Sequence, residues 1–174
     1  LEEELKTIAG RGIRVIGPNC FGIYCPKSGL TMLPGPDLSR KPGGVALLSQ
    51  SGGLSIDFGY MGKWRGIHFS KVVSFGNGCD LRETEMLRYL RHDSQTKVIC
   101  MYVEGVADGR DFFTALKLTA AEKPVIVIKG GLSESGSRAV ASHTASMGGK
   151  RAIWEAALRQ CHITQVENLE EMSD

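Results

Sequence analysis

The sequence has few of the features that mark membrane, secreted or nucleic-acid-binding proteins. No apolar run approaches the roughly 20 residues of a membrane-spanning helix, and the opening segment LEEELKTIAG has neither the basic region nor the apolar core of a signal peptide. The formal net charge is only +2, and Lys and Arg are interspersed with Asp and Glu, a pattern that argues against a nucleic-acid or membrane surface. We therefore expect a cytoplasmic protein that binds neither nucleic acid nor a membrane.

Cysteine pairs with metal-ligand or redox spacing are also missing. The chain has five cysteines, Cys20, Cys25, Cys79, Cys100 and Cys161, which is an odd number without CxxC spacing. Cys100 lies within the apolar run VICMYV, where a cysteine is typical of a small buried side chain. The pattern predicts structural thiols in a reducing compartment.

The sequence does contain a regular alternation of apolar and amphipathic segments. Apolar strands are expected at residues 45–49, 71–75, 97–103, 124–129 and 163–166, with helices at 53–64, 81–91, 110–121 and 149–160 and a last helix starting at Asn168. In the helix at 81–91, the spacing places Met86, Leu87 and Leu90 in the core and Glu83 on the solvent side. The alternation predicts an α/β fold, a flavodoxin-like doubly wound parallel sheet with helices on both faces.

The N-terminal part does not follow this alternation. A helix at 1–8 with Gly10 as its cap, a short strand at 13–16 and a turn at 17–19 come first. A proline-rich stretch at 25–44 then reads as an irregular or hairpin-like connection that lies outside the core. Because the chain opens inside a helix, we expect residues 1–24 to be the end of a preceding domain and its connection, and residues 25–174 to be a second domain.

A long Gly/Ser-rich segment, KGGLSESGSRAVASHTASMGGKR, spans residues 129–151 between a predicted strand and a predicted helix and has His143 near its centre. The whole chain has 22 glycines, where average usage predicts roughly 12. Polar connections of this length inside a compact domain are uncommon unless they are functional. No second His or Cys lies at ligand spacing from His143, so a metal site is not expected there. A histidine in such a segment is nevertheless often an ordinary loop residue.

Polar residues follow the first four predicted strands of the alternation, at the sheet edge where open parallel sheets bind ligands. They are Gln50-Ser51-Gly52-Gly53, Gly76-Asn77-Gly78, Glu104-Gly105 and the His143 segment. Ser51-Gly52-Gly53 opens a helix, so its backbone N–H groups could receive a phosphate, although an N-cap serine with turn glycines explains the same residues. Glu104 could orient an imidazole and raise its basicity, or it could be a solvated strand-end carboxylate.

Five runs of residues strongly resemble the NDP-forming (ADP-forming) acyl-CoA synthetases, relatives of the α subunit of succinyl-CoA synthetase. The runs are GIRVIGPNCFGIYCP, LLSQSGGLSIDFGYMGKWRGIHFSKVVSFGN, TKVICMYVEGVADGRDF, KPVIVIKGG and SRAVASHTASMGG. The resemblance covers essentially the whole chain, and the ASHTAS context of His143 is its most specific part.

The resemblance implies a reaction and a role for each candidate residue. The family interconverts acyl-CoA, NDP and phosphate with free acid, CoA and NTP through an acyl phosphate and a phosphohistidine. By this match His143 is the phosphorylated residue and Glu104 orients it. Ser51, Gly52 and Gly53 form the helix N-terminus that receives the phosphate, and Asn19 and Cys20 lie near the CoA thiol. We also expect Lys129, Arg138 and Lys150, which flank the His143 segment, to favour anions there.

The resemblance also implies substrates and partners outside these residues. Coenzyme A and ATP or ADP are expected as substrates of the complete enzyme, with Mg²⁺ at a nucleotide site elsewhere. The partners are a CoA-binding Rossmann domain, which precedes residue 25, and an ATP-grasp domain, together with a small acyl substrate, in an oligomeric assembly. Two departures from the family pattern stand out: Ala145 where Gly is common, and the lack of both partner domains, so the chain alone should complete no turnover.

Two other functions fit the sequence less well. A non-catalytic module of a regulatory protein that senses acyl-CoA or nucleotide would need neither Glu104 nor His143. A hydrolase with Ser51 as nucleophile and His143 as base would be expected to have a GxSxG elbow, and SQSGG does not match it.

Overall fold

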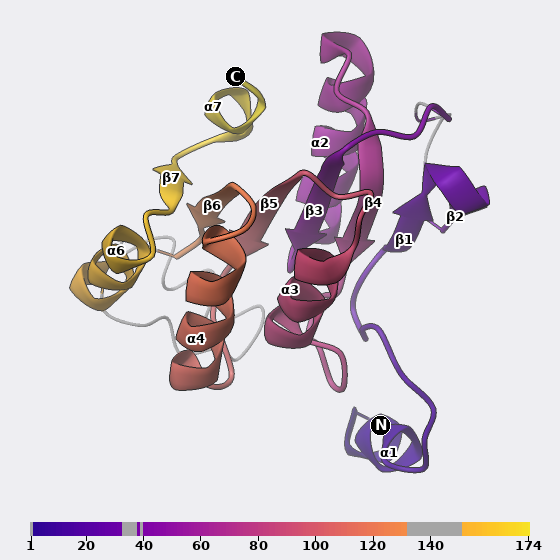
Figure 1. Ribbon diagram of the computed structural model, residues 1–174. Coiled ribbons are helices and arrows are strands. Elements are labelled where there is room, and N and C mark those ends of the chain that lie inside the picture. The colour runs from indigo at the N-terminus through magenta and orange to yellow at the C-terminus, as the bar shows by residue number, and fades with distance from the viewer. Residues whose placement is uncertain (1, 33–37, 39, 132–150) are drawn as a thin grey trace.

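The computed structural model describes residues 2–32, 38, 40–131 and 151–174 (Figure 1). The strands are β1 (Gly22–Cys25), β2 (Leu30–Thr31), β3 (Val45–Ser49), β4 (Phe69–Ser74), β5 (Val98–Val103), β6 (Val125–Lys129) and β7 (Thr164–Val166). The helices are α1 (Glu2–Ala9), the 3-10 turn η1 (Pro26–Ser28), α2 (Gly52–Arg65), α3 (Glu83–His92), α4 (Gly109–Ala120), α6 (Arg151–Gln160) and α7 (Leu169–Ser173). From β3 onward these elements lie within about two residues of their predicted positions.

The strands form one sheet in the order β2-β1-β4-β3-β5-β6-β7. Strand β3 pairs in parallel with both β4 and β5, and β5, β6 and β7 follow in parallel. Strand β4, which follows β3 in the sequence, lies on one side of β3, and β5 lies on its other side. This is the flavodoxin-like order, so the predicted doubly wound α/β fold is confirmed. The order in which strands are added to the sheet therefore reverses between β3 and β5. Ligands of such folds bind at the carboxyl ends of the two strands that flank this reversal.

The antiparallel hairpin β1–β2 extends the edge of the parallel sheet next to β4. The prediction of a hairpin-like connection is therefore right, but the hairpin is part of the sheet, and the predicted domain boundary at residue 25 falls inside β1. The predicted strand at residues 13–16 is wrong. This segment joins no ladder, and its backbone is instead bonded to the loop after β4, with Leu81 N donating to Val15 O at 3.0 Å.

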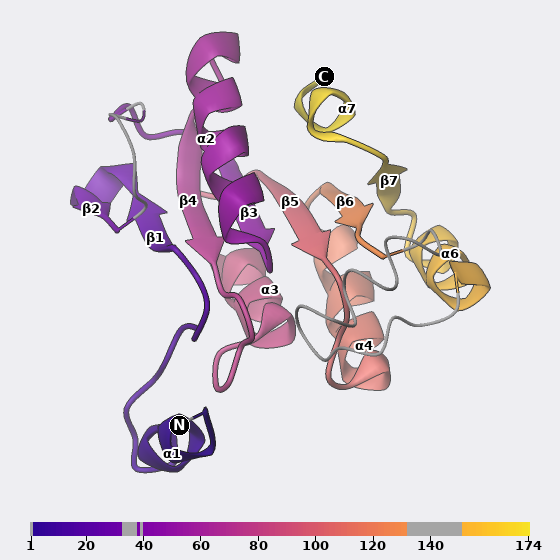
Figure 2. The same ribbon diagram turned by 180° about the vertical axis from the view of Figure 1, so that it is seen from behind.

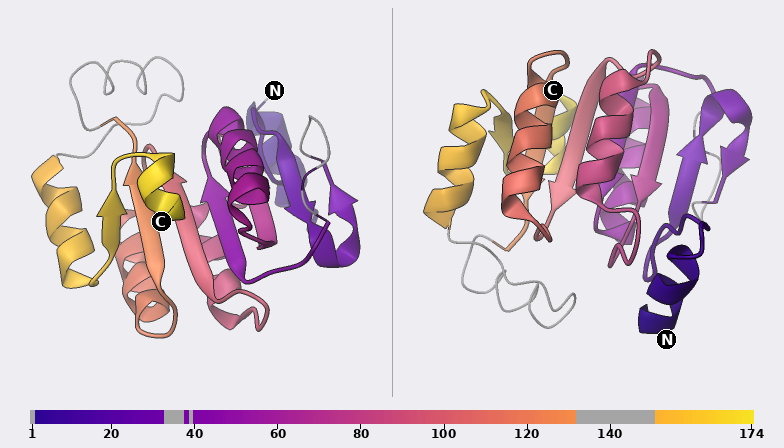
Figure 3. Two further views of the ribbon diagram at one scale, coloured as in Figure 1. Left: turned by 90° about the horizontal axis from the view of Figure 1, so that it is seen from above. Right: turned by 60° about the horizontal axis from the view of Figure 1, so that its bottom comes forward.

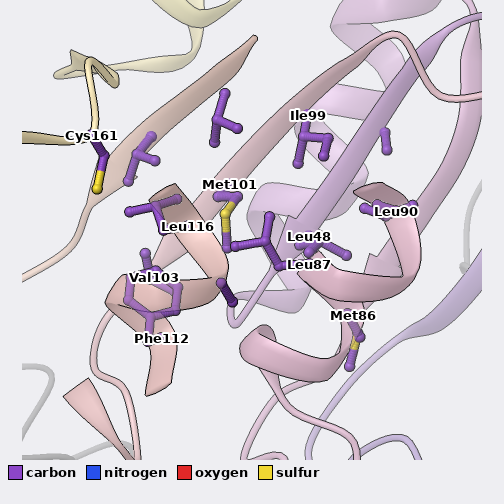
Figure 4. Packing of buried hydrophobic residues seen from close by; sticks show 14 of the residues in the cluster. Leu48, Met86, Leu87, Leu90, Ile99, Met101, Val103, Phe112, Leu116 and Cys161 are labelled. Carbon is purple, nitrogen blue, oxygen red and sulfur yellow. The ribbon is translucent and has the colours of Figure 1, made fainter. Parts of the chain in front are cut away.

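Helices cover both faces of the sheet (Figures 2 and 3). Alternate residues of the central strands supply the two cores. One core lies beneath α3, α4 and α6, and its strand residues include Leu48, Met101 and Val127. Figure 4 shows part of this cluster, with Leu87 of α3 and Phe112 and Leu116 of α4 packed over the sheet. The other core lies beneath α2 and α7 and includes Leu47, Phe58, Cys100, Ile128 and Met172.

The prediction from the sequence is wrong for one residue of α3, Glu83, which was expected on the solvent side. Met86, Leu87 and Leu90 are buried as predicted, but Glu83 is only 1% exposed. Its Oε1 accepts from the Ala107 N–H at 3.3 Å, and its Oε2 lies 3.4 Å from Nε of Arg82. A carboxylate at the first turn of a helix is favoured by the helix dipole. Here it also connects α3 to the loop that follows β5.

Candidate active site

A cavity of about 450 Å³ lies at the carboxyl ends of β3 and β5, where the sheet changes winding direction. It is lined by Asn19, Cys20, Phe21, Gln50, Ser51, Gly52, Gly53 and Glu104. The structure thus brings together every candidate site residue that it describes. His143 lies outside the described residues, as do Arg138 and Lys150.

The N-terminus of α2 forms one wall of this cavity. Ser51 is the N-cap, and its hydroxyl accepts from the Leu54 N–H at 3.3 Å. The first N–H groups of a helix have no intrahelical acceptor, and among the described residues those of Gly52 and Gly53 have no other acceptor, which leaves them for a ligand at the positive end of the helix dipole. Both interpretations of SGG therefore apply, since Ser51 caps the helix and the glycines leave backbone donors beside the cavity. The engagement of the Ser51 hydroxyl as a cap weakens the hydrolase alternative.

Glu104 forms the opposite wall, directly after β5. Tyr102 and Glu104 are two residues apart along the strand, so their side chains share the face that α2 covers. The Tyr102 hydroxyl donates to Oε1 of Glu104 at 3.2 Å. Oε2 is buried and has no hydrogen-bond partner among the described residues. Glu104 is therefore not the solvated strand-end carboxylate of the alternative interpretation, and one of its oxygens is available.

Gln50 connects the two walls, a role that was not predicted from the sequence. Its side chain is 6% exposed, and its Oε1 accepts from the N–H groups of Glu104 at 2.5 Å and Gly105 at 3.1 Å. Its own N–H donates to Tyr102 O at 3.1 Å. Gln50 therefore fixes the end of β5 against the start of α2. The available signal was an amide side chain placed directly after an apolar strand.

The third wall comes from the N-terminal segment, which is bound to the loop after β4. Asn77 N donates to Pro18 O at 3.0 Å, and Cys79 N donates to Gly17 O at 2.8 Å. Gly76 has a positive φ of 55°, and a Cβ built there would lie 2.1 Å from Asn19 O. The loop can approach Asn19 this closely only because residue 76 has no side chain. This contact holds Asn19 and Cys20 at the cavity.

Phe21 follows them and packs against the start of α2. A Cβ on Gly52 would lie 2.7 Å from the Phe21 ring, so Gly52 accommodates the ring at the helix N-terminus. The Phe21 N–H donates to the Ser74 hydroxyl at 3.1 Å. The cavity therefore has one aromatic wall beside its backbone donors.

Lys129 was expected to flank the His143 segment as a cation available to anions, but it does not line the cavity. Its side chain is 6% exposed and lies on the opposite face of the sheet, with Nζ 5.0 Å from the centre of the Trp154 ring. The ammonium donates to Glu104 O at 2.7 Å and to Gly130 O. Burial lowers its pKa from 10.5 to about 8, and the nearby Glu104 opposes this shift. Lys129 acts on the site through the backbone of Glu104.

The described residues also show the state of the cysteines, the length of the apolar helices and the grouping of metal-ligand side chains. All five cysteines are free, and Cys100 is buried as predicted, which raises the pKa of its thiol to about 12. No helix in the described ranges is long and apolar enough to cross a membrane. Within the same ranges, no three His, Cys, Asp or Glu side chains gather to hold a metal ion.

Known proteins similar to this chain include archaeal ADP-forming ligases. An ADP-forming acetate–CoA ligase of Archaeoglobus fulgidus is 41% identical over 175 residues, which cover 100% of this chain and 25% of that protein. The α subunit of ADP-forming acetate–CoA ligase II of Pyrococcus furiosus is 42% identical over 98% of this chain and 37% of its own length.

A solved structure similar to this one is that of acetyl-coenzyme A synthetase 1 of Candidatus Korarchaeum cryptofilum, in complex with phosphate and ADP. It matches with a TM-score of 0.89 and 39% identity over 99% of this chain and 38% of that chain. This chain therefore spans between a quarter and two fifths of the length of these relatives. Residues 42–174 match the family described as "Succinyl-CoA ligase like flavodoxin domain". The chain belongs to this family, as its sequence motifs predicted.

Proposed function

We propose that this chain is the phosphohistidine-carrying domain of an ADP-forming acyl-CoA synthetase. The observation that supports it most is that the unpartnered Oε2 of Glu104 and the N-terminus of α2 border one cavity. A carboxylate suits an imidazole N–H, and a helix N-terminus suits a phosphoryl group. A phosphorylated histidine needs both kinds of partner at once.

In the proposed reaction, an acyl phosphate forms from acyl-CoA and phosphate as the CoA thiol leaves. One imidazole nitrogen of His143 then attacks the phosphorus, and the bond between phosphorus and the acyl oxygen breaks to release the free acid. Glu104 accepts the N–H of the other imidazole nitrogen and stabilises the positive charge that develops on the ring. A terminal oxygen of NDP finally attacks the phosphorus, which breaks the N–P bond and gives NTP.

The backbone donors of Gly52 and Gly53 stabilise the phosphoryl oxygens during these transfers. Asn19 and Cys20 line the third wall of the cavity, and in the proposal the CoA thiol leaves beside them. The names of the relatives point to acetate or another small carboxylic acid as substrate and to ADP as nucleotide. Mg²⁺ would accompany the nucleotide, at a nucleotide site outside this chain.

The remaining parts of the enzyme lie outside this chain in the proposal. The relatives extend well beyond the aligned region, which supports a CoA-binding Rossmann domain and an ATP-grasp domain as partners, on the same chain or on a second subunit. We propose that residues 1–24 connect to the CoA-binding domain and that the assembly is oligomeric. Five free thiols support a reducing compartment such as the cytoplasm.

The proposal is tested with the full-length protein and its partner subunit, if the ATP-grasp domain is separate. Incubation with ATP labelled at the γ-phosphate should give a protein-bound phosphate that is labile in acid and stable in base. His143→Asn should abolish this label, whereas His92→Asn, at the exposed end of α3, should retain it. Labelling of the His143→Asn protein would overturn the assignment of His143.

A further inference from the structure

Three of the four hydrogen-bonding groups of Glu104, its N–H, its C=O and its two carboxylate oxygens, have partners. Gln50 accepts from its N–H, Lys129 donates to its C=O, and Tyr102 donates to Oε1. Oε2 is the remaining position, and it has no partner in the described part of the chain. Two of the three contacts fix the backbone, so among the described residues it is Tyr102 that determines which carboxylate oxygen is left available.

We infer that Tyr102 is a positioning residue for phosphoryl transfer: its hydroxyl occupies Oε1 of Glu104 and so presents Oε2 to the imidazole of His143. The inference rests on the proposed function and adds a residue to it. A carboxylate with two equivalent free oxygens could rotate and accept the imidazole N–H in several orientations. A carboxylate held through Oε1 offers one acceptor in one direction.

The surroundings of the Tyr102 hydroxyl keep it a donor. Its ring packs on the core beneath α2 and α7, and burial, followed by the charge of Glu104, raises the pKa of Tyr102 to about 12. The hydroxyl therefore stays protonated at every pH at which the enzyme would work. A hydrogen bond from a neutral hydroxyl to an ionised carboxylate is stronger than one between two neutral groups.

Gly130 provides the space for this arrangement. A Cβ on Gly130 would lie 2.6 Å from the Tyr102 hydroxyl oxygen, 3.0 Å from Cζ and 3.3 Å from Cγ of Glu104. The Gly130 N–H also donates to Val103 O at 2.9 Å, which keeps the end of β6 beside these two residues. A side chain at residue 130 would therefore push the hydroxyl away from Oε1 with Tyr102 itself unchanged.

The test uses Tyr102→Phe in the full-length enzyme, with Tyr24→Phe as the matched control. Tyr24 is also a buried tyrosine, 4% exposed, and its hydroxyl has no partner among the described residues. We expect Tyr102→Phe to slow single-turnover labelling of His143 from acetyl-CoA and labelled inorganic phosphate about tenfold, the effect of losing one hydrogen bond to a charged group. The phosphate concentration for half-maximal rate should stay unchanged, because Tyr102 does not line the cavity. Tyr24→Phe should label like wild type.

The dependence on phosphate concentration separates positioning from a purely structural role. A structural defect that distorted the cavity would raise the phosphate concentration for half-maximal rate as well as slow labelling. An unchanged rate, a raised phosphate concentration for half-maximal rate or an equal loss in Tyr24→Phe would overturn the inference.

A second variant keeps the inference falsifiable if Tyr102→Phe folds poorly. Gly130→Ala should slow labelling to a similar extent, and the double variant should be little slower than either single one, since both remove the same contact. Fully additive losses would contradict this. Absence of label in the wild-type enzyme would overturn the proposed function and the inference with it, whereas a labelled wild type matched by both variants would overturn the inference alone.

Discussion

Lys129 is a buried ammonium whose hydrogen bonds go to the backbone carbonyls of Glu104 and Gly130. Transfer of a charge from water into the interior disfavours the charged form, which is why its pKa falls to about 8. In return, the ammonium holds the ends of β5 and β6 together beside the cavity. Lys129 thus supports the geometry of the site, but its burial as a charged group lowers the free energy of unfolding at neutral pH.

This cost gives a pH-dependent prediction. Between about pH 8 and pH 10.5 the folded chain has a neutral Lys129 while the unfolded chain still binds the proton, so rising pH favours the folded state. The free energy of unfolding of wild type should rise relative to Lys129→Met by up to about 3 kcal/mol across this range. Urea unfolding of the 174-residue chain at several pH values measures it.

The control for this experiment is Lys117→Met, which removes an exposed lysine from α4 and so changes the net charge equally. A difference between wild type and Lys129→Met that stays constant with pH would contradict a buried ammonium with a lowered pKa.

Helix α2 combines two demands, because its first residues border the cavity and its later residues pack on the sheet. Ser55, Phe58, Gly59 and Gly62 are buried against the strands. At the other end, Gly52 lies beneath the Phe21 ring, whereas a Cβ on Gly53 would have no heavy atom within 4 Å. Adjacent glycines in the same helix therefore serve different purposes.

Alanine substitutions should separate these purposes. Gly53→Ala should raise stability by about 0.5–1 kcal/mol, because alanine is the better helix former. Gly52→Ala gains the same propensity but overlaps the Phe21 ring, so it should be less stable than Gly53→Ala by about 1–3 kcal/mol. Thermal unfolding followed by circular dichroism compares the two variants. Equal midpoints would show that Phe21, which is 42% exposed, moves aside without cost.

The sequence was sufficient to predict the elements from β3 onward because their apolar periodicity is set by burial on both faces of a parallel sheet. It also placed Ser51 and Glu104 at one edge, since the ends of parallel strands meet there. The burial of Glu83 could not be predicted, because its partner Ala107 belongs to the loop after β5. The segment at 13–16 has the alternation of a strand, but its backbone partners lie in the loop after β4. Neither contact has a local signal.

These two long-range contacts show how the assembled molecule completes the site. The N-terminal segment supplies Asn19 and Cys20 but has no secondary structure of its own at residues 13–17. Asp80 holds it through a hydrogen bond from the Val15 N–H at 2.7 Å and an ion pair with Arg14. These contacts, first that with Arg14, lower the pKa of Asp80.

Asp80→Ala should therefore loosen one wall of the cavity while the sheet remains folded. We expect backbone hydrogen exchange in residues 11–20 to become at least about tenfold faster, since Val15 N loses its acceptor. Glu122→Ala, which removes an exposed ion pair with Arg91, should leave these residues protected. In wild type, protection should persist above the ordinary Asp pKa of 3.8 and decline as pH falls through the lowered value, because the contact requires the ionised carboxylate. Equal exchange in the two variants would mean that the bonds of Gly17 and Pro18 to the loop after β4 hold the segment without Asp80.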